Sequence, residues 1–243
     1  MNQRKSITIN LIGITAIAIM MMLLFGFASF PVIGHAEGEA QQPGAEVPTN
    51  PEYFQSLEGT QKGAKITLKW GRLADTSMIK VYGGYVGSSM KCLKIIKNNT
   101  TTSVTIKKLN NKKINTRKVF KFKLFTYKNV NGVDTLMVKS PVIYIAGTRH
   151  IRYTNIKTLK VTQKSFTLAK GTTAKIKAKT TKENKKKELL PPECGPKYSY
   201  FSTNKNVATV GFDGTITGVE PGICTVYVYT VNGKNRKVNV TVQ

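Results

Sequence analysis

The stretch Phe201–Val228 reads FSTNKNVATVGFDGTITGVEPGICTVYV and carries the clearest fold signal in the sequence. Its apolar residues alternate with polar ones, and clusters of turn formers interrupt it. Asp213-Gly214 is a pair that tight hairpins prefer, because both central residues need a positive φ. Pro221-Gly222 marks a second turn, and Asn232-Gly233 a third before a last strand up to Val242. Short strands at roughly ten-residue spacing predict an antiparallel β-sandwich.

The strand Ile223–Tyr229 indicates which side chains are buried. Its alternation places Cys224 on the apolar face, and Tyr227 and Tyr229 on the opposite one. A tyrosine pair on an outer face has two interpretations. It could stack on sugars or receive a partner protein, or it could serve cross-strand packing, which we favour.

The same stretch resembles the bacterial Ig-like group 2 domain. The resemblance is carried by S-T-N-K-N-V-A-T-V (Ser202–Val210), D-G-T-I-T-G (Asp213–Gly218) and P-G-I-C-T-V-Y-V (Pro221–Val228). Upstream, Ile156–Val161 and Ser165–Leu168 agree, so the likeness covers about Ile156 to Val242. The chain departs from the family in a long charged insert, Thr181–Pro196, and in Tyr200, where the family often has Trp.

A second run of strand patterns lies upstream, from Ala64 to Thr148. It resembles a fibronectin type III domain. The motifs that carry this likeness are I-T-L-K-W (Ile66–Trp70), I-K-V-Y (Ile79–Tyr82), S-V-T-I with Leu109, F-K-F-K-L-F-T-Y (Phe120–Tyr127) and S-P-V (Ser140–Val142). That family usually has Tyr where Phe120 stands, so the packing is kept and a hydroxyl hydrogen bond is lost. Asn131-Gly132 predicts a hairpin turn, and Ala146–Asn155 is interpreted as a connector with a small, polar interdomain contact.

The N-terminus reads as a targeting segment rather than part of the fold. Arg4 and Lys5 precede the apolar run Ile7–Phe27, and small residues at Gly34-His35-Ala36 suit cleavage. The alternative is an uncleaved membrane anchor, since the run is long enough to span a bilayer. Either interpretation predicts export, to the cell surface or the extracellular space. No sorting motif follows Val242, so covalent wall anchoring is not expected.

The predicted fold class is therefore all-β, with two tandem Ig-like β-sandwiches behind a signal peptide and a flexible linker. The expected parts are a signal peptide (1–36), a flexible acidic linker (37–59), a fibronectin type III-like sandwich (60–148) and a bacterial Ig-like group 2 sandwich (149–243). The less favoured alternative for the end of the linker is that Tyr53, Phe54 and Leu57 dock on the first sandwich as an edge strand.

The chain is strongly basic, with a formal net charge of +26. Lysines on the outer faces of strands have two interpretations, protection of sheet edges and attraction to polyanions. Export and the absence of interleaved stacking aromatics in the basic stretches argue against nucleic acid as the physiological partner. We therefore expect an anionic cell-wall polymer, a polysaccharide or a surface protein, with membrane contact only if the N-terminal segment stays uncleaved. The candidate contact residues are Lys182, Lys185, Lys186 and Lys187 of the insert.

Catalytic and metal chemistry is not indicated. Cys92, Cys194 and Cys224 are an odd number without C-x-x-C spacing, so we expect no metal site and no cofactor. Cys224 is expected to be a buried free thiol, and a Cys194–Cys224 disulfide is the alternative that export permits. His150 lacks triad partners and is expected to be solvated, and no carboxylates suggest a facing glycosidase pair. We therefore expect that the protein is not an enzyme.

The sequence thus predicts a non-catalytic binding or adhesion protein whose basic faces contact anionic wall polymers or polysaccharides. The alternatives are a ligand-free structural spacer and an accessory module of a polysaccharide-degrading system.

Overall fold

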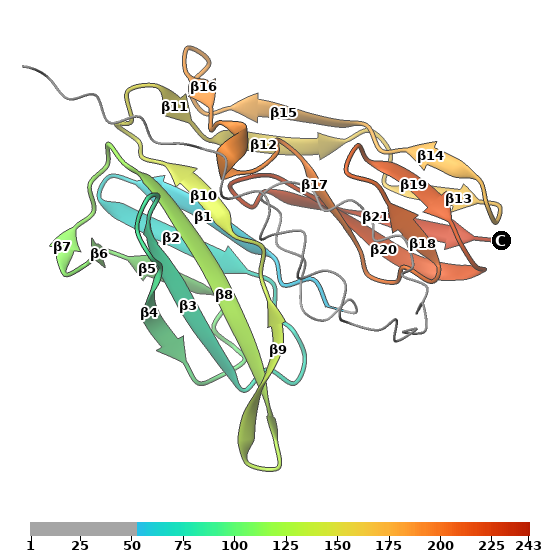
Figure 1. The fold of residues 1–243 in the computed structure, drawn as a ribbon, viewed down its shortest axis with the longest axis horizontal. Helices are drawn as coiled ribbons and strands as arrows, with labels where there is room; N and C mark the ends of the chain where they lie inside the picture. Colours follow the sequence, from blue (N-terminus) through green and yellow to red (C-terminus); the bar gives the residue numbers. More distant parts are fainter. Residues whose placement is uncertain (1–52) are drawn as a thin grey trace, which may run out of the picture. The chain divides into compact units, whose positions relative to one another are not determined.

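The computed structural model describes residues 53–243. These residues form strands, loops and one 3-10 turn, η1 (Pro192–Cys194), with no α-helix within the described range (Figure 1). The prediction of an all-β fold is confirmed. The predicted signal peptide and most of the predicted linker lie outside the described residues.

The N-terminal sandwich, residues 57–146, has two facing sheets and a separate two-stranded ribbon. Its strands are β1 (Leu57–Lys62), β2 (Lys65–Trp70), β3 (Met78–Tyr85), β4 (Lys91–Ile96), β5 (Ser103–Ile106), β6 (Lys108–Leu109), β7 (Lys112–Lys113), β8 (Val119–Val130), β9 (Val133–Lys139) and β10 (Ile143–Ala146). The ribbon consists of β6 and β7. One sheet has the order β1-β2-β5, and the other β10-β8-β3-β4, with β9 along the far part of β8 (Figure 1). Between them lies an apolar core that includes Ile66, Leu68, Val81, Phe120, Phe122 and Leu124.

Two asparagine-containing turns shape this sandwich. Asn131 and Gly132 both have positive φ, 52° and 84°, so the predicted hairpin between β8 and β9 is confirmed. Asn110 and Asn111 form a second such turn between β6 and β7, with φ values of 51° and 61°. This turn is not among those predicted from the sequence. Asn tolerates the left-handed region, so the missed signal was the Asn pair itself.

The chain joins the fold earlier than the linker prediction places it. Leu57, Glu58 and Gly59 already belong to β1, and Phe54 and Gln55 are buried. The Gln55 side chain accepts a hydrogen bond from Thr126 Oγ1 (2.8 Å) and donates one to the Gly71 carbonyl (2.9 Å). The end of the predicted flexible linker is therefore ordered sheet, because its few apolar side chains find partners far away in the sequence.

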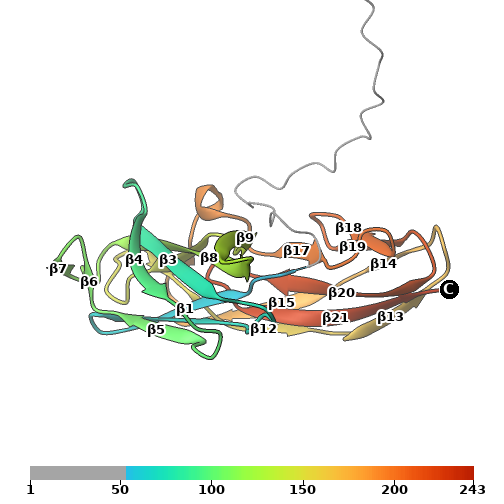
Figure 2. The ribbon, with the colours of Figure 1, turned by 90° about the horizontal axis from the view of Figure 1, so that it is seen from below.

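The C-terminal sandwich spans residues 153–242. Its strands are β11 (Tyr153–Thr154), β12 (Ile156–Val161), β13 (Ser165–Leu168), β14 (Thr173–Lys175), β15 (Ala178–Lys182), β16 (Glu188–Leu189), β17 (Ser199–Ser202), β18 (Ala208–Val210), β19 (Thr215–Gly218), β20 (Gly222–Tyr229) and β21 (Asn235–Val242). One face is the sheet β13-β21-β20-β17, and the other is made by β12-β15 and β14-β19-β18. β13 lies parallel to β21, and β20 lies on the other side of β21 (Figure 2).

The turn at Asp213-Gly214 differs from the predicted two-residue hairpin. Only Gly214 has a positive φ, 84°, and the Gly211 N–H donates to the Thr215 carbonyl (2.8 Å) to close a wider loop. The Asp213 carboxylate accepts hydrogen bonds from the Thr215 N–H (3.0 Å) and from the Lys175 ammonium. These donors lower the Asp213 pKa below its ordinary range. The side chain thus organises this loop.

All three cysteines of the described chain are free thiols. Cys224 lies in the core of the C-terminal sandwich, as predicted, with its Sγ 3.8 Å from Ser202 Oγ. Cys194 belongs to a separate apolar cluster with Ala146 and Leu190. The two thiols therefore occupy different clusters, and the alternative of a Cys194–Cys224 disulfide is not realised.

Candidate functional site

The junction between the two sandwiches is closely packed. The Tyr144 N–H donates to the Val231 carbonyl (2.8 Å), and the Lys234 ammonium contacts the Glu58 carboxylate at 2.6 Å. The Asn155 side chain pairs with both backbone groups of Ala146, at 2.8 and 3.0 Å. Apolar side chains, Leu190 and Cys194 among them, pack beside these bonds. The connector was expected to sit in a small, polar contact, whereas the contact has an apolar cluster because distant loops contribute to it.

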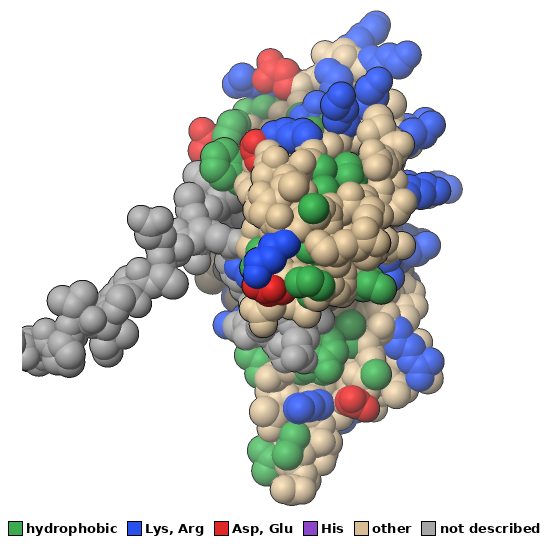
Figure 3. Space-filling view, turned by 90° about the vertical axis from the view of Figure 1, so that its right-hand side faces the viewer, with side chains coloured by type: hydrophobic (Ala, Val, Ile, Leu, Met, Phe, Trp, Pro, Cys, Tyr) green, Lys and Arg blue, Asp and Glu red, His purple; other side chains and the backbone are tan. Residues whose placement is uncertain are grey.

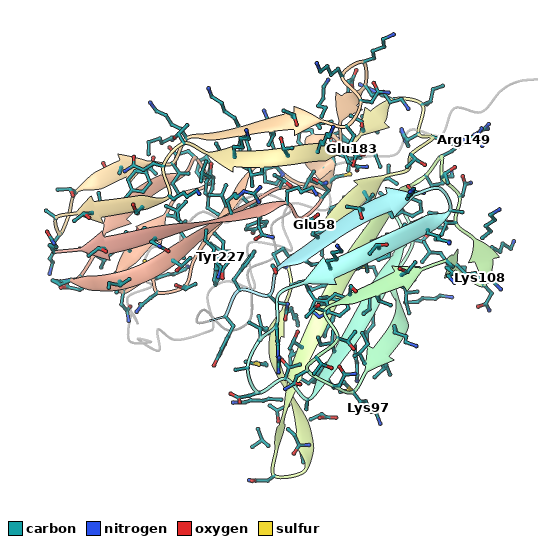
Figure 4. The ribbon with its side chains drawn as sticks, turned by 180° about the vertical axis from the view of Figure 1, so that it is seen from behind. Glu58, Lys97, Lys108, Arg149, Glu183 and Tyr227 are labelled. Atoms are coloured by element: carbon teal, nitrogen blue, oxygen red, sulfur yellow. The ribbon has the colours of Figure 1, made fainter. Side chains whose placement is uncertain are left out.

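Phe54 covers the tyrosines that the sequence placed on an outer face. Its ring lies 4.3 Å from the ring of Tyr227, 5.2 Å from Tyr229 and 5.4 Å from Phe201, between centroids (Tyr227 is labelled in Figure 4). Tyr229 is 8% exposed, and burial raises its pKa to about 12. The favoured interpretation, cross-strand packing, is confirmed, since Phe201 of β17 lies directly opposite Tyr227 in the same aromatic cluster. Phe54 from the predicted linker adds a partner that the interpretation did not include.

The four predicted contact lysines lie together in the insert but play unequal parts. The Lys182 ammonium donates to the Lys187 carbonyl (2.6 Å), and the Lys187 ammonium to the His150 carbonyl (2.5 Å). Both side chains therefore help to hold the loop. Lys185 and Lys186 are exposed, and they are the members of the set that can reach a ligand.

Acidic side chains partly offset the positive charge of the insert. Glu188 pairs with Arg152 at 2.9 Å, and Glu183 accepts a hydrogen bond from Asn155 Nδ2 at 3.1 Å (Glu183 is labelled in Figure 4). These contacts fasten the insert to the connector. The insert is thus a structural loop with an exposed basic tip.

A second basic surface, which we call the β12–β15 face, consists of Lys160, Lys177 and Lys179. In the register of the two strands Lys160 lies directly opposite Lys179, and all three side chains are exposed. Like charges directly opposite each other destabilise a sheet. In the part of the chain that the structure describes, no carboxylate pairs with any of the three. Figure 3 shows Lys and Arg side chains gathered along one side of the view, with few Asp or Glu among them.

His150 is half-exposed, and it also makes structural contacts that the prediction of a solvated side chain did not include. Its Nδ1 accepts hydrogen bonds from the backbone N–H groups of Arg152 (3.2 Å) and Tyr153 (2.9 Å), and its ring stacks on Tyr153. Burial and the nearby Lys187 ammonium lower its pKa below the ordinary 6.5. The ring is therefore held in place by Arg152 and Tyr153, which lie two and three residues after it in the chain. The absence of catalytic partners in the sequence gives no indication of these contacts.

We expect a titration of His150 by NMR to give a midpoint below pH 6.5. The folded chain disfavours the imidazolium, so the stability contributed by the neutral ring is present above the unfolded pKa and is lost as the pH falls. A His150→Asn variant assigns the resonance, since His35 is the other histidine of the sequence. A midpoint at or above 6.5 contradicts the acceptor role of Nδ1.

Between residues 53 and 243, no group of three His, Cys, Asp or Glu side chains is arranged to hold a metal ion. The described residues also include no helix long and apolar enough to cross a membrane.

Comparison with protein-family models matches residues 155–242 to the bacterial Ig-like domain (group 2). This segment is a bacterial Ig-like group 2 domain. It coincides with the stretch for which the sequence motifs indicated that family, and it contains β12 to β21. The search of curated proteins found no match.

Solved structures with some similarity cover various lengths of the chain. A C-terminal intimin fragment in complex with its translocated receptor is 13% identical over 79% of this chain and 64% of its own, with a TM-score of 0.29. The S-layer protein rSbsC is 14% identical over 78% of this chain and 35% of its own, with a TM-score of 0.31. Pectate lyase PelI from Erwinia chrysanthemi, in complex with tetragalacturonic acid, is 11% identical over 48% of this chain and 32% of its own, with a TM-score of 0.29. The chain thus spans less than two thirds of each of these proteins, and likenesses this distant carry no argument about function.

Proposed function

We propose that this chain is an exported surface or extracellular protein without catalytic activity, which binds an anionic wall polymer or polysaccharide through its basic faces. The observation that carries the proposal is the β12–β15 face, where Lys160 lies opposite Lys179 and neither pairs with a described carboxylate. Such an arrangement destabilises the free sheet, and a bound polyanion would relieve it. The exposed Lys185 and Lys186 extend the same charge at the tip of the insert.

The remaining parts of the proposal concern the N-terminal portion of the chain. The N-terminal segment acts as a signal peptide, and the N-terminal sandwich is a fibronectin type III-like module. The strand orders β1-β2-β5 and β10-β8-β3-β4 support this assignment, because they place the strands that carry the sequence motifs in two facing sheets.

The contribution of the β12–β15 face can be tested by neutralising it. We expect Lys160→Gln, Lys177→Gln and Lys179→Gln together to lower affinity for immobilised teichoic acid or polygalacturonate by about tenfold, since each lost ion pair weakens binding by roughly 0.5 kcal/mol. The matched control is Lys65→Gln, Lys69→Gln and Lys97→Gln, which removes the same charge from exposed positions of the N-terminal sandwich. Equal losses in both triple variants would reduce the proposal to an effect of net charge.

A structural spacer is the second candidate function, and the junction favours it. The hydrogen bonds, the Glu58–Lys234 pair and the Phe54 cluster tie the sandwiches together at several points. A spacer requires no ligand, so absence of binding to any anionic polymer at low salt would favour it.

A further inference from the structure

The outer face of the larger N-terminal sheet combines aromatic rings with lysines. We call it the aromatic–lysine face, defined by Lys80 and Tyr82 of β3, Phe125 and Tyr127 of β8, and Lys139 of β9. In the strand register Phe125 lies directly opposite Lys80 on one side and Lys139 on the other. Directly opposite side chains share a face and lie about 5 Å apart at Cβ. The three strands therefore place Phe125 between two lysine residues.

The ring and ammonium contacts hold these side chains close together. The rings of Tyr82 and Phe125 are 4.9 Å apart between centroids and inclined by 56°. The Lys80 ammonium lies 4.9 Å from the centroid of Tyr127, and that of Lys139 lies 5.5 Å from Phe125. The core of the sandwich is filled from the other side of the same strands. These rings are thus half-buried on an outer face, where the core does not require them.

Acids do not neutralise this face. The described part of the N-terminal sandwich contains three carboxylates, of which Glu58 contacts Lys234, and Asp134 accepts a hydrogen bond from Ser77 at 2.9 Å. The third, Asp75, lies in a turn before β3. Within residues 53–243 none of them pairs with Lys80 or Lys139.

Lys123 adds to the density of positive charge. It lies directly opposite Tyr82 in the register and is 5% exposed, with its ammonium 5.4 Å from the centroid of Phe125. Burial and then the charge of Lys139 lower its pKa. An anion seated nearby would offset this repulsion between lysines.

We propose that the aromatic–lysine face binds an acidic polysaccharide, with sugar rings against Tyr82, Phe125 and Tyr127 and carboxylates paired with Lys80 and Lys139. This inference rests on the proposed function and assigns it a second site, on the other sandwich. The rings select the ligand class. A sugar ring offers an apolar C–H face to an aromatic ring, whereas a polyol-phosphate chain offers charge alone.

The substitutions Tyr82→Leu and Phe125→Leu test the face, because Leu preserves apolar volume but removes the flat ring. With a galacturonate oligosaccharide as the probe in calorimetric titration of the full chain, we expect each to weaken binding about three- to tenfold, the range of one aromatic contact. Lys80→Gln with Lys139→Gln should weaken it further. Unfolding curves of the variants must overlay the parent curve, and Ile223→Leu, at an exposed position of the other sandwich, serves as the matched control.

Cys92 supplies an independent readout. It is the exposed cysteine of the three, and it lies directly opposite Tyr82 in the register. Saturating oligosaccharide should slow its alkylation, and an uncharged oligosaccharide of equal length should not. Two results would overturn the inference while leaving the proposed function intact: unchanged affinity in both Leu variants, or equal binding of a glycerol-phosphate polymer or a single-stranded oligonucleotide. Failure of the parent chain to bind any of these anionic polymers would instead overturn the proposed function.

Discussion

A Gly233→Ala substitution is expected to destabilise the protein by about 2–4 kcal/mol, as a change that combines backbone strain with a steric clash. Gly233 has φ +86°, and an added Cβ would lie 1.8 Å from the Leu57 carbonyl oxygen and 2.8 Å from Glu58 Cα. Both of these atoms belong to the backbone of β1, so no side chain can rotate away. The junction of the two sandwiches must open to admit the methyl group. Chemical denaturation measures the loss.

The matched control is Gly132→Ala in the β8–β9 hairpin. Gly132 has nearly the same φ, +84°, but an added Cβ there meets no atom within 4 Å. It should destabilise by about 1 kcal/mol, the cost of a left-handed conformation without a clash. Equal losses in the two variants would show that the contact of Gly233 with β1 contributes nothing.

The alkylation rates of the thiols report which part of the Gly233→Ala variant opens. Cys194 is buried at the junction and Cys224 in the core of the C-terminal sandwich, while Cys92 is exposed. Burial raises the pKa of both buried thiols, which further slows their alkylation. In Gly233→Ala we expect alkylation of Cys194 to accelerate, and that of Cys224 to stay at the parent rate. Acceleration of both thiols would indicate unfolding of the whole C-terminal sandwich.

The features that sequence reasoning predicted well are those with a local cause. Alternation along Ile223–Tyr229 placed Cys224 in the core, because side chains of a strand point to opposite faces in turn. The Asn131-Gly132 turn followed from the preference of that pair for positive φ. The Ig-like group 2 domain followed from motifs in the right order within one segment.

The features that it missed depend on contacts between residues far apart in the chain. Phe54 looked like part of a linker because its partners, Tyr227 and Tyr229, lie in a strand near the C-terminus. The face-to-face position of Lys160 and Lys179 depends on the register of two strands, which their separate sequences do not contain.

The candidate site was predicted only in part for the same reason. The run Lys185-Lys186-Lys187 is visible as a run of charge, but the bond from Lys187 to the His150 carbonyl is not. The aromatic–lysine face was missed because its members come from three separate strands, β3, β8 and β9. The register between strands is what brings Phe125 between Lys80 and Lys139.

Binding to an anionic polymer is expected to depend steeply on salt. With a net charge of +26 and lysines on several faces, contact with a polyanion releases condensed counterions, so the affinity falls as salt rises. Three lysine contacts would lower the affinity by about tenfold or more between 50 and 200 mM salt, on the scale known for phosphate chains. A protein that only holds other modules apart has no such dependence.

Retention of the purified chain on immobilised acidic polysaccharide and teichoic acid across this salt range distinguishes a polymer-binding protein from a ligand-free spacer. An uncharged polysaccharide on the same support is the control surface. We expect strong retention at low salt and a linear fall of the logarithm of affinity with the logarithm of salt concentration. No retention on either anionic polymer at 50 mM salt, or an affinity that salt leaves unchanged, would contradict this expectation.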